Sequence, residues 1–171
     1  MTVEQASSKM LTRAFVDALA GPYQDIPIPR CAKNLDWEGE LCFVIGRDCK
    51  DLEDGHNPSD YILGFMAGND LDLFLASYEA IGDPETLDLE TLVNGEVRQR
   101  GNTSDFLFSL RDIMINLTRG KTLRKGTIVM TGTPSGVAAF MKPPAWLKDN
   151  DEVEVRISGL GTLRNRHIFS A

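Results

Sequence analysis

The chain has 171 residues, of which 42% are hydrophobic and 25% charged, a composition typical of a globular domain. Its formal net charge of −7 argues against nucleic acid and anionic membranes as partners, because both are bound through positively charged surfaces. No apolar run approaches the ~20 residues that a membrane-spanning helix requires. The cysteines fit no zinc-ligand spacing, and the N-terminus has neither an apolar signal core nor the basic character of a transit peptide. We therefore expect an intracellular protein, with the cytoplasm as the first choice of compartment and the mitochondrion as the alternative.

An apolar run in the first third of the chain is the strongest local signal. Residues 1–18 before it are weakly patterned and are predicted to be an N-terminal extension with a short helix over residues 8–18. Prolines then favour an extended segment over residues 23–29. The run itself, Leu41 to Ile45, is apolar, β-branched and aromatic, which predicts a strand buried on both faces.

Turn residues divide the segment that follows. Asn57 and Pro58 provide an N-cap and a first-turn proline, which predict a short helix ending at Leu63. Residues 64–71 are predicted to form the next strand. Further on, Asn94-Gly95 is the strongest short hairpin signal, between predicted strands at 87–93 and 96–100, because a type I′ turn needs two residues with positive φ.

The rest of the chain predicts one long helix and three strands. Apolar residues at helical spacing predict a helix from Ser104 to Leu117. Strands are predicted at 126–132, 151–157 and 162–169, and the second of these alternates apolar and charged residues as a half-buried strand does. Many strands joined by hairpins indicate an α+β, strand-rich fold. A three-layer α/β fold is the second choice, because it needs more strand–helix alternation than the sequence offers.

Two carboxylates precede the central apolar strand. Side chains two residues apart on a strand point to the same side, so Glu38 and Glu40 are expected to share one face, roughly 7 Å apart along the chain. Their like charges repel, and a hard divalent cation such as Mg²⁺ or Mn²⁺ would compensate them, because these ions prefer carboxylate oxygens. On the spacing alone, a solvated strand end is the simpler explanation.

Four motifs, in chain order, resemble those of the fumarylacetoacetate hydrolase family. They are WEGELCFVIGRD, DYILGFMAGNDL, VNGEVRQ and GTIVMTGTPSGV. Family members typically carry a Glu-x-Glu-Leu strand, a Gly-Tyr-x-x-x-Asn-Asp-Val stretch, an Asn-Gly-Glu hairpin and a Thr-Gly-Thr-Pro-x-Gly-Val loop. The segment LAGPYQDIPIP at residues 19–29 is similar to the one before the Glu-x-Glu strand in fungal-type members. The resemblance covers residues 19–171 and implies the family's mixed β-sandwich roll, paired as a homodimer.

The resemblance also implies a metal site and a substrate class. By matching position, Glu38, Glu40 and Asp70 would bind Mg²⁺ or Mn²⁺, and Thr133 would hydrogen-bond the substrate. In the family, the metal is chelated by a small keto or enol acid of the acylpyruvate, fumarylpyruvate or oxaloacetate type, whose enolate it stabilises. Taken alone, Asp70 equally fits a turn after a strand, and Thr133 an ordinary Pro/Gly turn.

The sequence departs from the family pattern after residue 71. The family's Ser-x-Arg-Asp continuation and its lysine segment are missing, and no Arg or Lys occurs between Asp70 and Arg98. The lid that carries a His-x-x-Glu base is not matched either, and His56 and His167 fit surface or structural roles better. We therefore predict a domain at 19–171 that lacks the segment expected between residues 71 and 83.

Two functions compete on this basis. The first is a metal-dependent hydrolase or lyase of small keto or enol acids. A positioned base contributes roughly 10²- to 10⁴-fold in rate, so its absence predicts slow turnover that favours oxaloacetate decarboxylation or tautomerisation over acylpyruvate cleavage. The second is an impaired or inactive family member that serves as a metal-binding or partner subunit. A shortened gene model or splice form is a third explanation of the missing segment.

Overall fold

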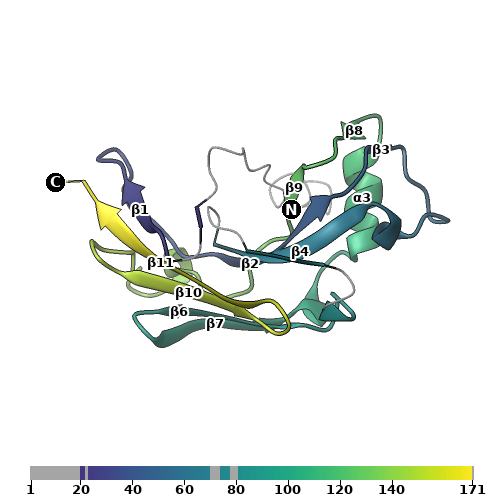
Figure 1. Cartoon of the computed structure of the whole chain (residues 1–171). Coiled ribbons are helices and arrows are strands. Elements are labelled where there is room, and N and C mark those ends of the chain that lie inside the picture. Colours follow the sequence, from purple (N-terminus) through teal and green to yellow (C-terminus); the bar gives the residue numbers. More distant parts are fainter. Residues whose placement is uncertain (1–19, 22, 70–73, 78–80, 171) are drawn as a thin grey trace.

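Two stacked β-sheets form the body of the molecule (Figure 1). The structure, a computed structural model, describes residues 20–21, 23–69, 74–77 and 81–170. The predicted helix over residues 8–18 lies outside these ranges. The elements in chain order are β1 (Asp25–Ile28), β2 (Gly39–Ile45), β3 (Cys49–Lys50), the 3-10 helix η2 (Pro58–Asp60), β4 (Ile62–Asn69), β5 (Phe74–Ser77), β6 (Asp88–Val93), β7 (Glu96–Asn102), the 3-10 helix η3 (Thr103–Asp105), α3 (Leu110–Thr118), β8 (Thr122–Leu123), β9 (Ile128–Met130), the 3-10 helix η4 (Ala138–Phe140), β10 (Glu152–Ile157) and β11 (Gly161–Phe169).

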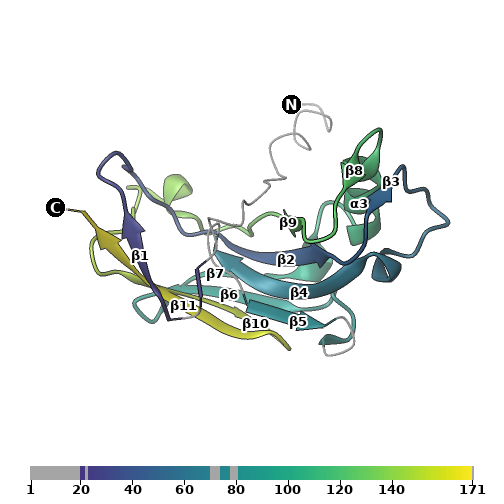
Figure 2. The same ribbon diagram turned by 45° about the horizontal axis from the view of Figure 1, so that its top comes forward.

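The five-stranded sheet is mixed, and the other two sheets are antiparallel. The five-stranded sheet has the order β1-β11-β10-β6-β7, the four-stranded sheet the order β5-β4-β2-β9, and β3 pairs with β8. The β1–β11 pair is parallel and the other pairs are antiparallel. Figures 1 and 2 place α3 with β3 and β8 at the end of the molecule opposite β1 and the C-terminus. The strand-rich α+β prediction is confirmed. No helix in the described residues is long and apolar enough to cross a lipid bilayer.

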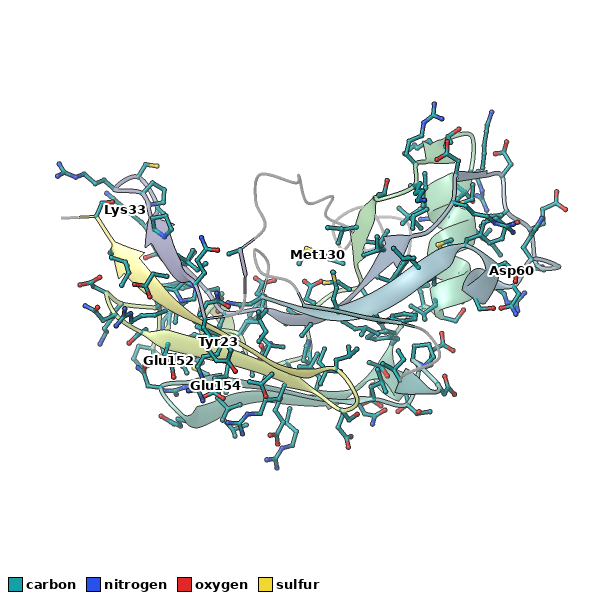
Figure 3. All side chains as sticks on the ribbon, in the orientation of Figure 1. Tyr23, Lys33, Asp60, Met130, Glu152 and Glu154 are labelled. Atoms are coloured by element: carbon teal, nitrogen blue, oxygen red, sulfur yellow. The ribbon has the colours of Figure 1, made fainter. Side chains whose placement is uncertain are left out.

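Strand β2 is buried on both faces, as its apolar run predicted. Leu41, Phe43 and Ile45 pack into the main core between the sheets, together with residues of β4, β10 and β11. Cys42 and Val44 face the other side, where they pack in a second cluster with β9. Figure 3 shows Met130, a member of this second cluster, on the side of the four-stranded sheet away from β10. Each fully buried side chain of this size contributes roughly 1.5–3 kcal/mol, which makes β2 the main anchor of the four-stranded sheet.

The predicted type I′ hairpin is present. Asn94 and Gly95 have φ of 51° and 80°, and Val93 pairs directly with Glu96 across the two-residue turn. The Asn94 side chain also accepts a hydrogen bond from the Glu152 N–H at 2.9 Å. The turn is therefore tied to the start of β10 as well as joining β6 to β7.

The prediction of a long helix from Ser104 to Leu117 is wrong in its first half. The described helix α3 begins at Leu110, where Ser109 and Asp112 form a capping box. Before it, residues 103–105 form only the single 3-10 turn η3. Thr103 also continues the β6–β7 pairing, because its N–H donates to the Leu87 carbonyl and its hydroxyl accepts from the Leu87 N–H. Phe106 still packs against the main core, but it does so from a non-helical backbone.

The short helix predicted to end at Leu63 is wrong as well. Asn57 caps a helix with Pro58 in its first turn, as predicted, but that helix is the single 3-10 turn η2, and Ile62 already belongs to β4. Ile45 of β2 pairs with Ile62, and the Gly46 N–H donates to the Tyr61 carbonyl. The helix therefore ends after one turn because the next residues pair with β2.

Strand β10 is correctly predicted, but it is more than half-buried. It lies between β11 and β6, and Glu154 is only 4% exposed. Its carboxylate accepts hydrogen bonds from Arg156 and Arg164 at 2.7 and 2.9 Å. Burial acts to raise the pKa of Glu154, but the two arginines outweigh it and hold the pKa below its ordinary value. The charged residues of the alternating pattern therefore form an ion cluster on the sheet.

Candidate functional site

The start of β2 brings two sequence motifs together. Gly39, between the two predicted ligands, lies opposite Asn69 of β4 in the antiparallel register. The Glu38 N–H donates to the Asn69 side-chain oxygen at 3.0 Å. The Glu-x-Glu motif and the Gly-Asn-Asp motif are therefore neighbours in the fold.

Gly39 faces the five-stranded sheet at very short range. A Cβ atom at this position would lie 2.0 Å from Thr91 Oγ1, a distance that no real side chain tolerates. Because side chains alternate along a strand, Glu40 projects from the opposite face, the one it shares with Cys42 and Val44. The absence of a side chain at the middle position of the motif thus lets the sheets pack closely behind the carboxylates.

The Glu40 carboxylate is buried and is held by the loop that follows β9. The residue is 7% exposed, and one carboxylate oxygen accepts the Gly132 N–H at 2.9 Å. The neighbouring Thr131 fixes that loop, because its N–H and its hydroxyl both donate to the Leu41 carbonyl. Hydrogen bonds of this kind offset part of the cost of burying a charge.

Thr133 lies beside the carboxylate pair. Its hydroxyl donates to the Gly39 carbonyl at 3.0 Å and accepts from the Gln99 side chain at 2.8 Å. A hydroxyl carries one hydrogen and two acceptor lone pairs. Since that hydrogen is used by Gly39, Thr133 has an acceptor lone pair, not a hydrogen, to offer a ligand.

The donor chemistry of the site fits a hard divalent cation. Mg²⁺ and Mn²⁺ are bound through oxygens, and Glu38 and Glu40, two positions apart at the start of β2, supply carboxylates. Asp70, the third predicted ligand, lies outside the described residues. Within those residues no group of three acidic, histidine or cysteine side chains is placed to hold a metal ion.

Residues that the sequence analysis did not single out fix the loop over the site. Asp36 accepts the Ala138 N–H at 2.6 Å, and the Trp37 indole donates to the Gly136 carbonyl at 3.0 Å. Gln99 bridges the loop to Gly39. Their places in the sequence could have pointed to these residues, because Trp37, Gln99 and Gly136 all lie within the motifs that resemble the family.

A cavity of about 780 Å³ adjoins the same loop. Gly132 and Thr133 line it, as do Ile115 and Asn116 of α3 and Arg119 just after that helix. The loop after β9 therefore has Glu40 and Gly39 as hydrogen-bonding partners and also borders a space large enough for a small organic acid.

The two histidines have the places that the sequence analysis favoured. His56 is exposed, and its ring accepts from the Glu53 N–H at 3.0 Å. His167 is buried in β11, and burial lowers the pKa of its imidazole below the ordinary value.

Comparisons with known proteins agree with the motifs. Residues 2–73 and 71–167 match the family model described as fumarylacetoacetate (FAA) hydrolase C-terminal. Oxaloacetate tautomerase Fahd2a, mitochondrial, of Rattus norvegicus is 33% identical over 177 residues, which cover 89% of this chain and 56% of that protein. Oxaloacetate tautomerase YisK of Bacillus subtilis is 36% identical over 158 residues, covering 77% of this chain and 52% of that protein. The crystal structure of 5-carboxymethyl-2-hydroxymuconate delta-isomerase from Mycobacterium smegmatis superposes with a TM-score of 0.79 at 31% identity, over 90% of this chain and 66% of that one.

The chain spans about half the length of the curated relatives it matches. The alignment to the rat protein is 177 residues long, although it includes 89% of the 171 residues here. The rat protein therefore carries residues inside the aligned region that this chain lacks.

Proposed function

Because the chain belongs to the fumarylacetoacetate hydrolase family, we propose that it processes small keto or enol acids with the help of a divalent cation. The observation that carries the proposal is the buried Glu40 carboxylate, held by Gly132 beside Glu38 and Thr133. Relatives named as oxaloacetate tautomerases, and a similar structure named as a hydroxymuconate isomerase, support the substrate class.

The proposed ligands of Mg²⁺ or Mn²⁺ are Glu38, Glu40 and Asp70. A bound divalent cation supplies Lewis-acid stabilisation of an enolate, which is worth several kcal/mol. Gly132 orients the Glu40 carboxylate through its N–H. Thr133, whose hydrogen is committed to Gly39, is proposed to accept a hydrogen bond from the hydroxyl of an enol.

We expect tautomerisation or decarboxylation of oxaloacetate-type acids to exceed hydrolysis of acylpyruvates. Hydrolysis of a C–C bond needs a positioned base for water, worth about 3–5 kcal/mol. The domain at 19–171 is proposed to lack the segment expected between residues 71 and 83, and the longer aligned region of the rat relative supports this shortening. No Arg or Lys stands between Asp70 and Arg98 to replace the cationic groups of that segment.

The test is an assay of purified protein on oxaloacetate and on an acylpyruvate, with Mg²⁺ or Mn²⁺ and with a chelator. Enol–keto conversion and pyruvate release are followed separately. The informative variant is Glu40→Gln, because its side chain can still accept the Gly132 N–H but carries no charge. Glu53→Gln, at an exposed carboxylate, is the matched control.

We expect slow, metal-dependent turnover of oxaloacetate that Glu40→Gln abolishes and Glu53→Gln preserves. Efficient turnover in chelator would refute the metal-dependent mechanism. If metal stabilises the fold against heat and neither substrate turns over, the second function applies, that of a metal-binding or partner subunit without catalysis. The lack of a cationic residue between Asp70 and Arg98 is the observation that favours this second function.

The assembly and location of the protein are also proposals. A homodimer is expected from the family resemblance, and sedimentation that finds only monomer at micromolar concentration would contradict it. An intracellular location is proposed, cytoplasmic or mitochondrial, and the name of the rat relative includes the word mitochondrial. Fractionation of cells that express a tagged chain distinguishes these compartments.

A further inference from the structure

The Gln99 side chain occupies a central place behind the candidate site. It extends from β7, is 1% exposed, and contacts two segments that are far apart in the sequence. Its oxygen accepts the Gly39 N–H at 3.0 Å. Its nitrogen donates to Thr133 Oγ1 at 2.8 Å and to the Pro134 carbonyl at 2.9 Å.

The side-chain amide satisfies all three partners because it carries both an acceptor oxygen and a nitrogen with two hydrogens. The Gly39 N–H can only donate and the Pro134 carbonyl can only accept, so the orientation of the amide is unambiguous. An apolar side chain would leave these groups buried without that partner, and a carboxylate would face the Pro134 carbonyl with an acceptor.

Thr133 closes a ring of hydrogen bonds with Gln99 and Gly39. Gln99 donates to the Thr133 hydroxyl, which therefore points its own hydrogen at the Gly39 carbonyl. As a result, both main-chain polar groups of Gly39 are bonded to side chains. Gly39 is the residue that links Glu38 to Glu40, so its main-chain orientation sets how the two carboxylates stand relative to each other.

We propose that Gln99 is the positioning residue of the site, which holds the Gly39 main chain so that Glu38 and Glu40 can bind one divalent cation together. The inference rests on the proposed function for the carboxylates, and it adds a role for Gln99, the last residue of the VNGEVRQ motif. Gln99 also determines which way the Thr133 hydroxyl points, and with it the acceptor that Thr133 presents.

The alternative is that Gln99 only stabilises the fold. Asn165 on β11 provides a matched control for that alternative. It is likewise a buried amide, 2% exposed, whose nitrogen donates to the Gly21 and Gln24 carbonyls at 2.9 Å. We compare Gln99→Met with Asn165→Leu, because both replace the amide by an apolar group of similar size.

The experiment measures Mn²⁺ affinity by electron paramagnetic resonance, and stability by urea unfolding, on the same preparations of the full chain. Loss of a residue that orients a metal ligand weakens metal binding roughly 10- to 100-fold. We expect a loss of that size for Gln99→Met, with a lower kcat on oxaloacetate. Asn165→Leu should lose stability but keep the Mn²⁺ affinity of the wild type. If Gln99→Met does not fold, Gln99→Asn, whose amide is one methylene shorter, is measured in its place with the same expectation.

Each result separates this inference from the function on which it rests. If the wild type binds Mn²⁺ and Gln99→Met binds it equally well, the positioning role is wrong and the proposed function stands. An equal loss of affinity in Asn165→Leu also overturns the positioning role, because the effect is then a general consequence of destabilisation. If the wild type itself does not bind Mn²⁺, the proposed function fails and the inference fails with it.

Discussion

A single methyl group at Gly39 tests the packing behind the site. Its Cβ would lie 2.0 Å from Thr91 Oγ1 and 3.2 Å from Val155 Cγ1. Gly39→Ala must therefore turn the Thr91 side chain or move β2 away from the five-stranded sheet. Overpacking of this kind costs about 1–3 kcal/mol. In a chain of this length, each kcal/mol lowers Tm by about 2–4 °C, so we expect a decrease of about 2–12 °C.

A second substitution should relieve the clash. Thr91 Oγ1 is buried and has no hydrogen-bond partner in the described part of the chain, so Thr91→Ala removes the nearest clashing atom and breaks no hydrogen bond described there. The nearest contact of the new methyl group is then Val155 Cγ1. We expect the double variant to be more stable than the sum of the single effects, by a coupling free energy of about 1–2 kcal/mol.

The assay is urea unfolding of the wild type, both single variants and the double variant, compared at a common m-value. Mn²⁺ titration of the same proteins reports whether the carboxylates move with the strand. The reasoning is refuted if Gly39→Ala stays within about 0.5 kcal/mol of the wild type, the usual range for a surface change. Strict additivity in the double variant would show that Thr91 is not the obstacle.

Three further substitutions test other parts of the structure by urea unfolding. Burial lowers the pKa of His167, so below pH ~6.5 the unfolded chain binds a proton that the folded chain excludes, and stability falls with acidification by up to about 1.4 kcal/mol per pH unit. His167→Gln should reduce that loss between pH 7.5 and 5.5; an equal loss in the variant and the wild type would contradict the assignment. Ser109→Ala removes the cap of α3 and should cost about 1 kcal/mol, and no loss would show that the capping box is not formed in solution. Glu154→Gln should cost about 1–2 kcal/mol at pH 7, less than a fully buried pair because Arg156 and Arg164 stay about half exposed. Because the pKa of Glu154 is lowered, its contribution is lost as the pH falls, and the variant should approach the wild type in acid; a constant difference would contradict the ion cluster.

Local chemistry was sufficient for the elements whose signals are short in range. The apolar, β-branched run at Leu41–Ile45 is β2, and Asn94-Gly95 is a type I′ turn, because its two positive φ angles suit these residue types and few others. The four motifs indicated the family, and the family indicated a strand-rich α+β fold.

Tertiary contacts decided where local patterns were ambiguous. Helical spacing from Phe106 onward predicted burial correctly but not backbone conformation, because an apolar side chain reaches the core equally well from an extended segment. Thr103 pairs with Leu87, a contact that depends on the β6–β7 hairpin and not on the residues around Thr103. Similarly, the position of β10 between two strands buried Glu154, which an alternating pattern by itself would leave exposed.

The candidate site divides in the same way. The sequence named Glu38, Glu40 and Thr133, and the role of Asp70 stays a prediction from the motif. Only the fold brings the Gly132 N–H to Glu40 and the Gln99 amide to Gly39, across 92 and 60 positions of the chain. The residue types around Glu40 and Gly132 favour a strand end and a turn, but they do not indicate which groups will lie next to them in the fold. Strand order and register decide which polar groups meet, and those depend on how the whole chain buries its apolar faces.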